Sequence, residues 1–300
     1  MTSGVLVMAH GTPANAEEIL PFYTRIRRGR PPEPQQLAEL EGRYRAIGGV
    51  SPLAERTRAQ VDAVRAELEA RAPSRYVVAF GAKHTAPLIE DAAAALASAG
   101  LERVVGLVLT PHASSMGSQE YLDRAAAALV GTRFVAVGPW YAEPAFVALL
   151  AARVTAALGT LPGRRRVIFT AHSLPERIRQ SGDTYPEQLA ESARLVAEAA
   201  GLEEWLVAWQ SAGRTPDPWL GPDVRDEVRR LAADGTTDAV VVCPIGFVAD
   251  HLEVLYDLDV EVATVASECG VGFARTASLN DDPAFVSVLA DVIIAADEAP

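Results

Sequence analysis

The chain has 300 residues, of which 49% are hydrophobic, and a formal net charge of −12 at pH 7. This length allows one large domain or two of average size, and the acidic balance argues against a general nucleic-acid binder, which normally carries a basic stripe. The two cysteines, Cys243 and Cys269, have no CxxC spacing, which argues against a disulfide framework or a four-thiolate cluster.

The N-terminal segment lacks a basic start followed by an apolar core and a cleavage site, so the sequence predicts no signal peptide. The apolar run 145–159 is interrupted by Arg153, and no segment reaches the length of a membrane span. We therefore expect a cytoplasmic protein with no membrane span.

Short β-branched runs alternate with helical stretches along the whole chain. This alternation predicts parallel sheets covered by helices on both faces. We predict strands near residues 4–9, 75–81, 103–110, 133–138, 166–171, 204–209, 238–243 and 260–266. We predict helices most clearly over residues 53–71, 88–99, 118–130, 144–158, 185–200, 222–234, 248–257 and 282–296.

The two halves of the chain resemble each other in sequence. The first predicted strand ends in MAHGTP (8–13) and the fifth in TAHSLP (170–175), and similar pairs recur at the next two strand ends in the same order. This recurrence predicts an internal duplication of one α/β unit. We expect two Rossmann-like, doubly wound domains, 1–160 and 161–300, and leave open whether the last helix packs back on the N-terminal one. They would face each other across a cleft lined by strand C-terminal ends, where open α/β sheets bind ligands.

Three carboxylates follow the seventh predicted strand at four-residue spacing: Glu253, Asp257 and Glu261. On a helix these positions lie on one face, and the sequence near them offers no basic partner to relieve their repulsion. Carboxylate oxygens suit hard divalent cations. The pattern therefore predicts a helix that carries metal.

Histidines follow the predicted strands. His251 lies on the helix after a strand, and the other four lie at or near strand ends. A single histidine is more often structural, but strand ends converge on one cleft, and His10 and His172 occupy equivalent positions in the two halves. With Glu253 they would form a mixed nitrogen and oxygen site, which suits a borderline transition metal better than magnesium or calcium. The five histidines are His10, His84, His112, His172 and His251.

A basic cluster lies near the N-terminus, in a chain that is otherwise acidic. A solvated helix face is the ordinary interpretation of such a run, but paired arginines suit bidentate contacts with carboxylates. The segment GGVSP (48–52) adds free amides and the Ser51 hydroxyl. We predict a small anionic ligand here; RNA is the competing anion, but no aromatic stacking residues are interleaved. The cluster consists of Arg25, Arg27, Arg28, Arg30, Arg43 and Arg45.

A segment rich in proline and glycine, QSAGRTPDPWLGPD (210–223), predicts a rigid, shaped loop rather than a linker. Trp209 and Trp219 fit either a wall for a flat apolar ligand or the core, and the sequence favours neither.

The motifs AHSLPER, WQSAGRTPDPWLGPD and CPIGFVADHLEVLYD resemble those of ferrochelatases, and the resemblance covers essentially the whole chain. YTRIRRGR with RYRAIGGVSPLAERT is similar to the soluble bacterial type, which inserts ferrous iron into coproporphyrin III. The resemblance implies the class II chelatase fold and a lyase of haem biosynthesis whose substrates are coproporphyrin III and ferrous iron.

The resemblance also implies roles for individual residues. His172 and Glu253 match the metal- and proton-handling pair of the porphyrin cleft, and Asp257 and Glu261 match the outer acids, a second metal site or a proton path. His84 falls at a pocket position that can touch metal. The residues that match propionate contacts or pocket walls are Arg27, Arg28, Arg43, Ser51 and Tyr121.

The chain departs from the family pattern at His10, where related soluble enzymes carry a tyrosine that ligates the iron of product haem. Imidazole also suits cobalt and nickel, so the preferred metal and the tetrapyrrole stay open. A second alternative is a carrier that holds coprohaem or metal without turnover. We expect no iron–sulfur cluster and no other prosthetic group, because iron is substrate, and a downstream coprohaem-handling enzyme is a candidate partner.

The expected chemistry assigns one task to each group. The arginine cluster would anchor the propionates, and the cleft would hold the macrocycle distorted. His172, which titrates near neutrality when unperturbed, would accept pyrrole protons. Glu253 would pair with it, and His10 would hold the metal on the other face.

Overall fold

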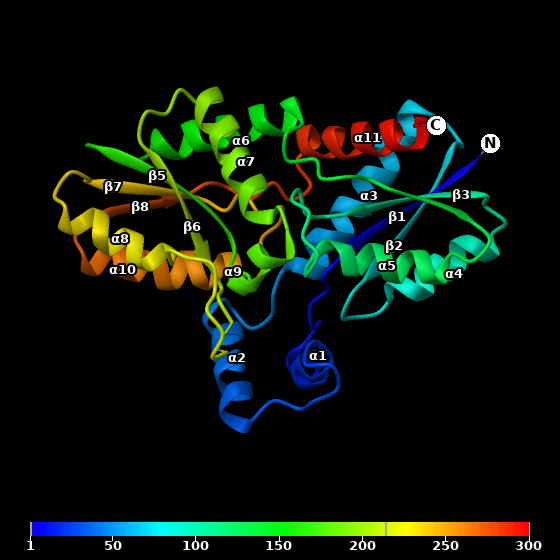
Figure 1. Cartoon of the computed structure of the whole chain (residues 1–300), viewed down its shortest axis with the longest axis horizontal. Helices are drawn as coiled ribbons and strands as arrows, with labels where there is room; N and C mark the ends of the chain where they lie inside the picture. Colours follow the sequence, from blue (N-terminus) through cyan, green and yellow to red (C-terminus); the bar gives the residue numbers. More distant parts are fainter. Residues whose placement is uncertain (1, 214, 300) are drawn as a thin grey trace.

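The computed structural model describes residues 2–213 and 215–299, and it contains two parallel four-stranded sheets side by side (Figure 1). The strand order is β2-β1-β3-β4 in the first sheet and β6-β5-β7-β8 in the second, so both halves share one topology. The predicted α/β class with two Rossmann-like parallel sheets is confirmed, and the shared topology agrees with an internal duplication. The strands are β1 (Ser3–Ala9), β2 (Tyr76–Ala82), β3 (Arg103–Val108), β4 (Arg133–Ala136), β5 (Arg165–His172), β6 (Trp205–Gln210), β7 (Ala239–Cys243) and β8 (Gly272–Arg275).

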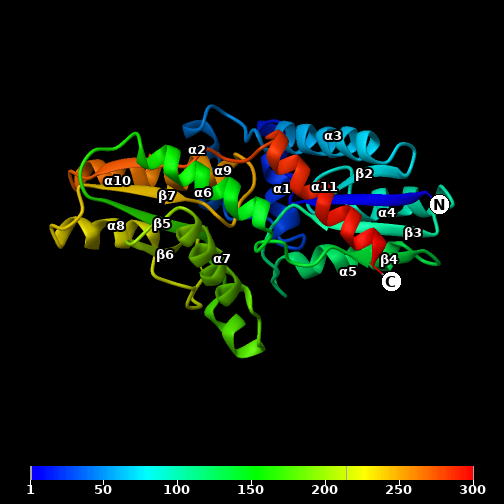
Figure 2. The same ribbon diagram turned by 90° about the horizontal axis from the view of Figure 1, so that it is seen from above.

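Helices connect the strands and cover both faces of each sheet (Figures 1 and 2). The α-helices are α1 (Ile19–Ile26), α2 (Pro34–Ala46), α3 (Leu53–Arg71), α4 (Ile89–Ser98), α5 (Ser118–Ala128), α6 (Pro144–Leu158), α7 (Tyr185–Ala199), α8 (Val224–Ala233), α9 (Leu252–Leu255), α10 (Ala263–Glu268) and α11 (Pro283–Glu298). The remaining helical turns are the 3-10 helices η1 (Ala16–Glu18) and η2 (Glu176–Ser181) and the π-helix η3 (Asp257–Val262). None of the helices in the described part of the chain is long and apolar enough to cross a membrane.

Strand β1 shows why these strands are apolar throughout. Val5 and Val7 pack in a core shared with α3 and α11, whereas Leu6 and Met8 pack in a second core shared with α4 and α5. Successive side chains of a strand point to opposite faces of the sheet, and a parallel sheet is covered on both. All residues of β1 are consequently buried.

Two helices cross between the halves. Helix α6 packs against α7, β7 and β8 of the second half, whereas the last helix, α11, packs against α3, β3 and β4 of the first. Figure 2 shows α11 lying diagonally across the first sheet, near both termini. A single apolar cluster therefore runs from Val5 through Phe146 and Phe285 to Phe169. Dividing the chain at residue 160 separates the sheets but not the helices that cover them.

The predicted strand 260–266 is wrong, because these residues continue the helical path that begins at α9. The π-helix η3 passes directly into α10, and the eighth strand is β8, some residues later. Val254, Leu258 and Val262 are buried together in the core that contains Val228 and Leu231 of α8. Their four-residue spacing is helical, and it prevails over the β-branched composition of the segment.

Helices α1 and α2 project from the body below the junction of the two sheets (Figure 1). Neither is among the helices predicted most clearly, because prolines interrupt the run between them. Helix α2 begins at Pro34, and the side chains of Glu33 and Gln36 form a reciprocal capping box at its start. This projecting pair carries the arginine cluster.

Candidate active site

His172 and Glu253 lie together at the carboxyl edge of the second sheet. His172 is the last residue of β5, and Glu253 lies in α9, just after β7. The His172 Nε2 atom is 3.5 Å from Glu253 Oε1, and His251 Nε2 is 3.7 Å from Glu253 Oε2. The carboxylate therefore lies between two imidazoles. His251 was not among the predicted site residues, although it lies only two residues before Glu253.

The His172–Glu253 pair is ionised in this structure. Burial lowers the pKa of His172, but the Glu253 carboxylate and the Ser173 carbonyl, to which Nδ1 donates, more than offset this and raise it to about 9. Burial raises the pKa of Glu253, whereas the neighbouring His172 lowers it more strongly, to well below its ordinary value. The expectation that His172 accepts pyrrole protons rested on an unperturbed imidazole, whereas the Glu253 carboxylate raises the pKa of His172 above neutrality in this structure.

His10 and His84 form a second histidine pair at the edge of the first sheet. Their ring centroids are 4.7 Å apart, and Phe22 packs edge-on against His10 at 5.9 Å. Loss of water around the ring lowers the pKa of the half-buried His84 to about 3. It also lowers the pKa of His10, although this residue keeps an exposed surface, so both imidazoles are neutral at pH 7. The His10 Nδ1 atom lies 3.1 Å from the Gly11 carbonyl and donates to it, which leaves Nε2 with a free lone pair. The Glu253 carboxylate acts to raise the pKa of His10. The His172–Glu253 pair and the His10–His84 pair therefore influence each other electrostatically.

Asp257 and Glu261, the outer two of the three spaced carboxylates, have basic partners, although the sequence near them predicted none. The Arg43 guanidinium is 3.6 Å from Asp257, and the Arg225 guanidinium is 3.1 Å from Glu261. Ser211 donates a hydrogen bond to Asp257, which is 5% exposed. Burial and the nearby Glu253 raise the pKa of Asp257 to about 6. Both acids lie on the π-helix η3, a winding that is frequent at functional sites.

The predicted metal ligands do not form one preformed cage. Within residues 2–213 and 215–299, no three His, Cys, Asp or Glu side chains are grouped so as to hold a metal ion. The structure instead separates the expected set into the His172–Glu253 pair, His10 beside His84, and the arginine-paired acids Asp257 and Glu261. This separation is compatible with a metal that is delivered to a bound ligand rather than stored.

The arginine cluster borders a shallow hollow of about 570 Å³ on α1. Arg25 and Arg28 line this hollow, and Arg28 has a left-handed backbone with a φ of 56°. Arg27 stacks over Tyr23 at 5.7 Å, and its buried Nε has no hydrogen-bond partner among the described residues. Arg43 faces Asp257 instead. Arg25 and Arg28 can therefore bind an anion in the hollow, whereas Arg43 is paired with Asp257.

Ser51 and Tyr121, the other predicted pocket residues, are mostly buried. The Ser51 hydroxyl accepts a hydrogen bond from the Leu53 amide at the start of α3, a local role. The Lys83 ammonium lies 4.9 Å from the centre of the Tyr121 ring, and burial raises the pKa of Tyr121. Lys83 directly precedes His84 in the chain.

The loop 210–223 packs on the residues that follow His172. The Leu174 carbonyl accepts from the Leu220 amide at 2.9 Å, and the Ser173 hydroxyl donates to the Leu220 carbonyl at 2.8 Å. Arg214 of this loop lies outside the described residues. Trp209 is buried against Tyr185 and belongs to the core, whereas Trp219 is half-buried and donates to Thr215.

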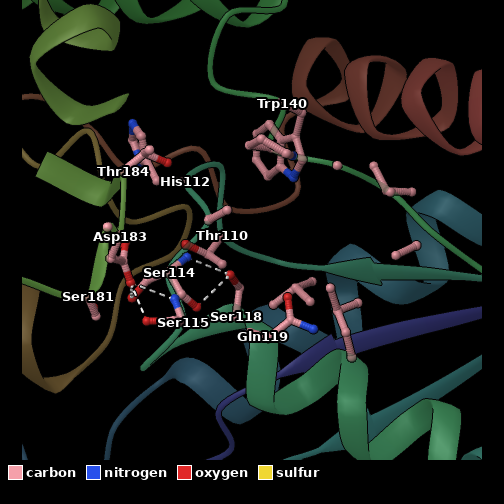
Figure 3. Close-up of a pocket in the computed structure, with 18 residues that line it drawn as sticks. Thr110, His112, Ser114, Ser115, Ser118, Gln119, Trp140, Ser181, Asp183 and Thr184 are labelled. Atoms are coloured by element: carbon pink, nitrogen blue, oxygen red, sulfur yellow. Dashed lines mark hydrogen bonds between the residues drawn. The ribbon is translucent and has the colours of Figure 1, made fainter. Parts of the chain in front are cut away.

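A cavity of about 400 Å³ lies apart from these histidines, at the carboxyl ends of β3 and β4 (Figure 3). Asp183 closes one side by accepting hydrogen bonds from Ser114 and Ser115, so this wall bridges the two halves. His112 also lines the cavity; it is buried, its pKa is lowered to about 3 by burial, and it stacks on Tyr141.

Residues 2–297 match the family model described as Ferrochelatase. The chain belongs to the ferrochelatase family. This ferrochelatase is 46% identical over 299 residues to the coproporphyrin III ferrochelatase of Bacillus subtilis (strain 168), covering 97% of this chain and 96% of the relative. It is 44% identical over 301 residues to the coproporphyrin III ferrochelatase of Geobacillus kaustophilus (strain HTA426), covering 98% and 95%.

Solved structures of chelatases share the fold. SirB from Bacillus subtilis with Fe3+ superposes with a TM-score of 0.61 at 12% identity, covering 99% of this ferrochelatase and 96% of SirB. CbiX, described as the terminal enzyme of sirohaem biosynthesis in denitrifying bacteria, superposes with a TM-score of 0.57 at 18% identity, covering 98% and 99%. The predicted class II chelatase fold is confirmed.

Proposed function

We propose that this ferrochelatase inserts ferrous iron into coproporphyrin III to give coprohaem, as a lyase of haem biosynthesis. The observation that carries the proposal is the pairing of His172 and Glu253 at 3.5 Å on the edge of the second sheet, where the Glu253 charge also acts on His10 beside His84 of the first. Relatives that are 42–46% identical over nearly their whole length are named coproporphyrin III ferrochelatases. Membership in their family supports the same reaction here.

Insertion replaces two pyrrole protons by one divalent metal ion, so the site must both accept protons and hold the incoming ion. The neutral imidazole of His10 offers a free lone pair for either purpose. On the other side, the ionised Glu253 is the available acceptor, and His172 is the proton carrier beside it. Asp257, with a pKa raised to about 6, would pass protons onward from this pair.

The arginines at the end of α1 would bind the propionates of the macrocycle. Arg28 lines the open hollow together with the apolar side chains of Leu20 and Pro21, a combination that fits a carboxylate on an apolar ring. The Nε atom of Arg27, next to Arg28 in the chain, has no hydrogen-bond partner among residues 2–213 and 215–299. Remote binding of this kind fixes the ring relative to the histidines, and fixed geometry lowers the barrier.

A chelatase for another metal or tetrapyrrole is the second candidate. The feature that favours it is His10, because the family resemblance implies a tyrosine at this position. A neutral imidazole next to a second one at 4.7 Å suits cobalt and nickel as well as iron. A carrier that holds coprohaem or metal without turnover is a third candidate, and a multiple-turnover assay separates it from both enzymes.

Several further properties belong to this proposal. We propose action in the cytoplasm, with no resident prosthetic group, and transfer of coprohaem to a downstream haem-handling enzyme. Cys243 is buried and Cys269 exposed, far apart in sequence, a poor basis for an iron–sulfur cluster.

An anaerobic insertion assay tests the proposal. Fe(II), Co(II) and Ni(II) are each offered against coproporphyrin III, protoporphyrin IX and sirohydrochlorin, and the porphyrin absorption band is followed over many turnovers. Catalytic iron insertion into coproporphyrin III supports the proposal. Turnover with another metal or macrocycle alone supports the second candidate, and binding without turnover supports the carrier.

A further inference from the structure

Gln210 connects the two members of the His172–Glu253 pair. It is the last residue of β6 and pairs in register with His172, the last residue of β5. Its side chain is 1% exposed, and both ends of its amide are used. The amide oxygen accepts a hydrogen bond from the Thr170 hydroxyl at 2.8 Å, and the amide nitrogen donates to the Glu253 main-chain carbonyl at 3.0 Å.

A main-chain contact adds to this connection. The Gln210 carbonyl accepts a hydrogen bond from the Ser173 amide at 2.7 Å, immediately after His172. Gln210 therefore holds the end of β5 through Thr170 and Ser173, and it holds the start of α9 through Glu253. These contacts link the strand that ends in His172 to the helix that carries Glu253.

We propose that Gln210 is a positioning residue that sets the distance between the His172 imidazole and the Glu253 carboxylate. Helix α9 has four residues and leads into a π-helical turn, so it is too short to fix its own position. The loop before it lies against β5, where a Cβ atom at Gly246 would come within 2.5 Å of the Ala171 Cβ. The buried hydrogen bond from Gln210 also holds α9 against the second sheet. A hydrogen bond constrains direction as well as distance, whereas apolar packing does not.

The effect on catalysis follows from the geometry. Deleting the amide leaves the Thr170 hydroxyl and the Glu253 carbonyl without this partner in a buried place, so the helical start is free to shift. A displacement of about 1 Å in a catalytic group can reduce the rate by about 100-fold. Gln210 touches neither metal nor porphyrin in this scheme, and it acts only through the pair.

A second buried glutamine provides a matched control. Gln60 is also 1% exposed, and its amide nitrogen donates to the main-chain carbonyls of Val248 and Asn280, at 3.2 and 2.9 Å. It joins α3 to the second half without contacting His172 or Glu253. Val248 lies in the loop before α9, so replacing Gln60 removes the same kind of bond from the same depth without breaking a direct contact to either member of the pair.

The kinetic test compares Gln210→Met with Gln60→Met, and it rests on the proposed function. Both variants should unfold at lower urea concentration, but only Gln210→Met should lower kcat, by about 10- to 100-fold. The KM for coproporphyrin III should change by less than about threefold, because the propionate contacts are intact. Thr170→Val, which removes one anchoring bond, should give a smaller loss. Wild-type kcat in Gln210→Met, or equal losses in both glutamine variants, would overturn the inference.

Crystal structures of the same variants give a readout without activity. The distance from His172 Nε2 to Glu253 Oε1, 3.5 Å in the parent chain, should lengthen by more than about 0.5 Å in Gln210→Met and stay constant in Gln60→Met. An unchanged distance in Gln210→Met contradicts the positioning role. If the parent chain shows no insertion activity, the proposed function fails, and the crystallographic comparison still decides the role of Gln210.

Discussion

Arg43 of helix α2 reaches Asp257 on the π-helix η3, with 3.6 Å between the guanidinium and the carboxylate. The same guanidinium lies 5.1 Å from the centre of the Tyr256 ring. One side chain thus connects the projecting N-terminal helices to the helical segment that carries the outer acids. Even with this cation nearby, burial and Glu253 keep the pKa of Asp257 raised to about 6.

The raised pKa of Asp257 predicts a pH-dependent cost in stability. The folded protein holds a proton on Asp257 up to about pH 6, whereas the unfolded chain loses it near pH 3.8. Folded molecules therefore bind more protons within this window, and the contribution of Asp257 to stability falls as pH rises through it. Asp257→Asn should gain about 2–3 kcal/mol relative to the parent chain between pH 4 and pH 7. Urea unfolding at several pH values measures this, and a pH-independent difference contradicts it.

Removing the His172 imidazole should abolish turnover. We expect His172→Ala to lower kcat by about 10²- to 10⁴-fold, the usual contribution of a group that transfers protons, while coproporphyrin III still binds. Stopped-flow insertion measures the chemistry, and porphyrin fluorescence measures binding. His112→Phe is the control, because His112 is buried beside the separate cavity. Retained turnover in His172→Ala would remove the role assigned to this residue.

Removing the Arg27 guanidinium should weaken porphyrin binding. Its buried Nε has no hydrogen-bond partner among the described residues, and its neighbour in the chain, Arg28, lines the open hollow. A charge-assisted bond to a propionate is worth about 1.5–3 kcal/mol, so Arg27→Ala should raise KM by about tenfold or more and leave kcat nearly constant. Arg177→Ala, on an exposed ion pair with Asp217, is the control. An unchanged KM in Arg27→Ala would show that Arg27 does not bind a propionate of the porphyrin.

Replacing His10 should change the choice of metal. Its imidazole is neutral, and an imidazole nitrogen binds cobalt and nickel better than an oxygen donor does. In His10→Phe we expect kcat/KM for Co(II) to fall relative to Fe(II) by about tenfold, or about 1.4 kcal/mol. Competition assays with both metals measure the ratio. A constant ratio shows that His10 does not contact the incoming ion.

Among the residues of α11, Asp297 should contribute most to the free energy of unfolding through its polar contacts. Its 7% exposed carboxylate receives hydrogen bonds from Ser3, Arg75 and Tyr76, and the Arg103 guanidinium lies 3.2 Å away. Removing one partner of a buried ion pair costs about 3–5 kcal/mol, so Asp297→Ala should lower the free energy of unfolding by roughly that amount. Glu298→Ala, on an exposed pair with Arg75, should cost less than about 1 kcal/mol. Similar losses in urea unfolding would contradict this.

The fold was predictable wherever strand and helix periods were clear. The repeat of MAHGTP and TAHSLP predicted two equivalent sheets because both segments end a buried strand. The segment 260–266 failed because valines dominate its composition, although Val254, Leu258 and Val262 repeat at helical spacing. The sequence left open whether the last helix packs on the first half, and it could not decide the exchange of α6 and α11, since the apolar face of a helix does not specify which sheet it covers.

The site was predictable as a set of residues but not as a set of pairs. Strand-end positions brought His172 near Glu253 and His10 near His84, as parallel topology requires. Partners distant in sequence were missed: Arg43 on Asp257 and Arg225 on Glu261. Protonation could not be predicted either, because the pKa of His172 depends on a carboxylate 81 positions later and on how deeply both groups are buried.

The return of α11 to the first sheet affects how the protein is made. Strands β1 to β4 leave the ribosome first, yet the helix that covers one of their faces and carries Asp297 is among the last segments synthesised. At about 5–20 residues per second, the gap between β4 and α11 lasts on the order of 10–30 s. During that interval the first sheet exposes apolar surface that later becomes core. We therefore expect the nascent chain of this protein to bind chaperones that recognise such surface at the ribosome.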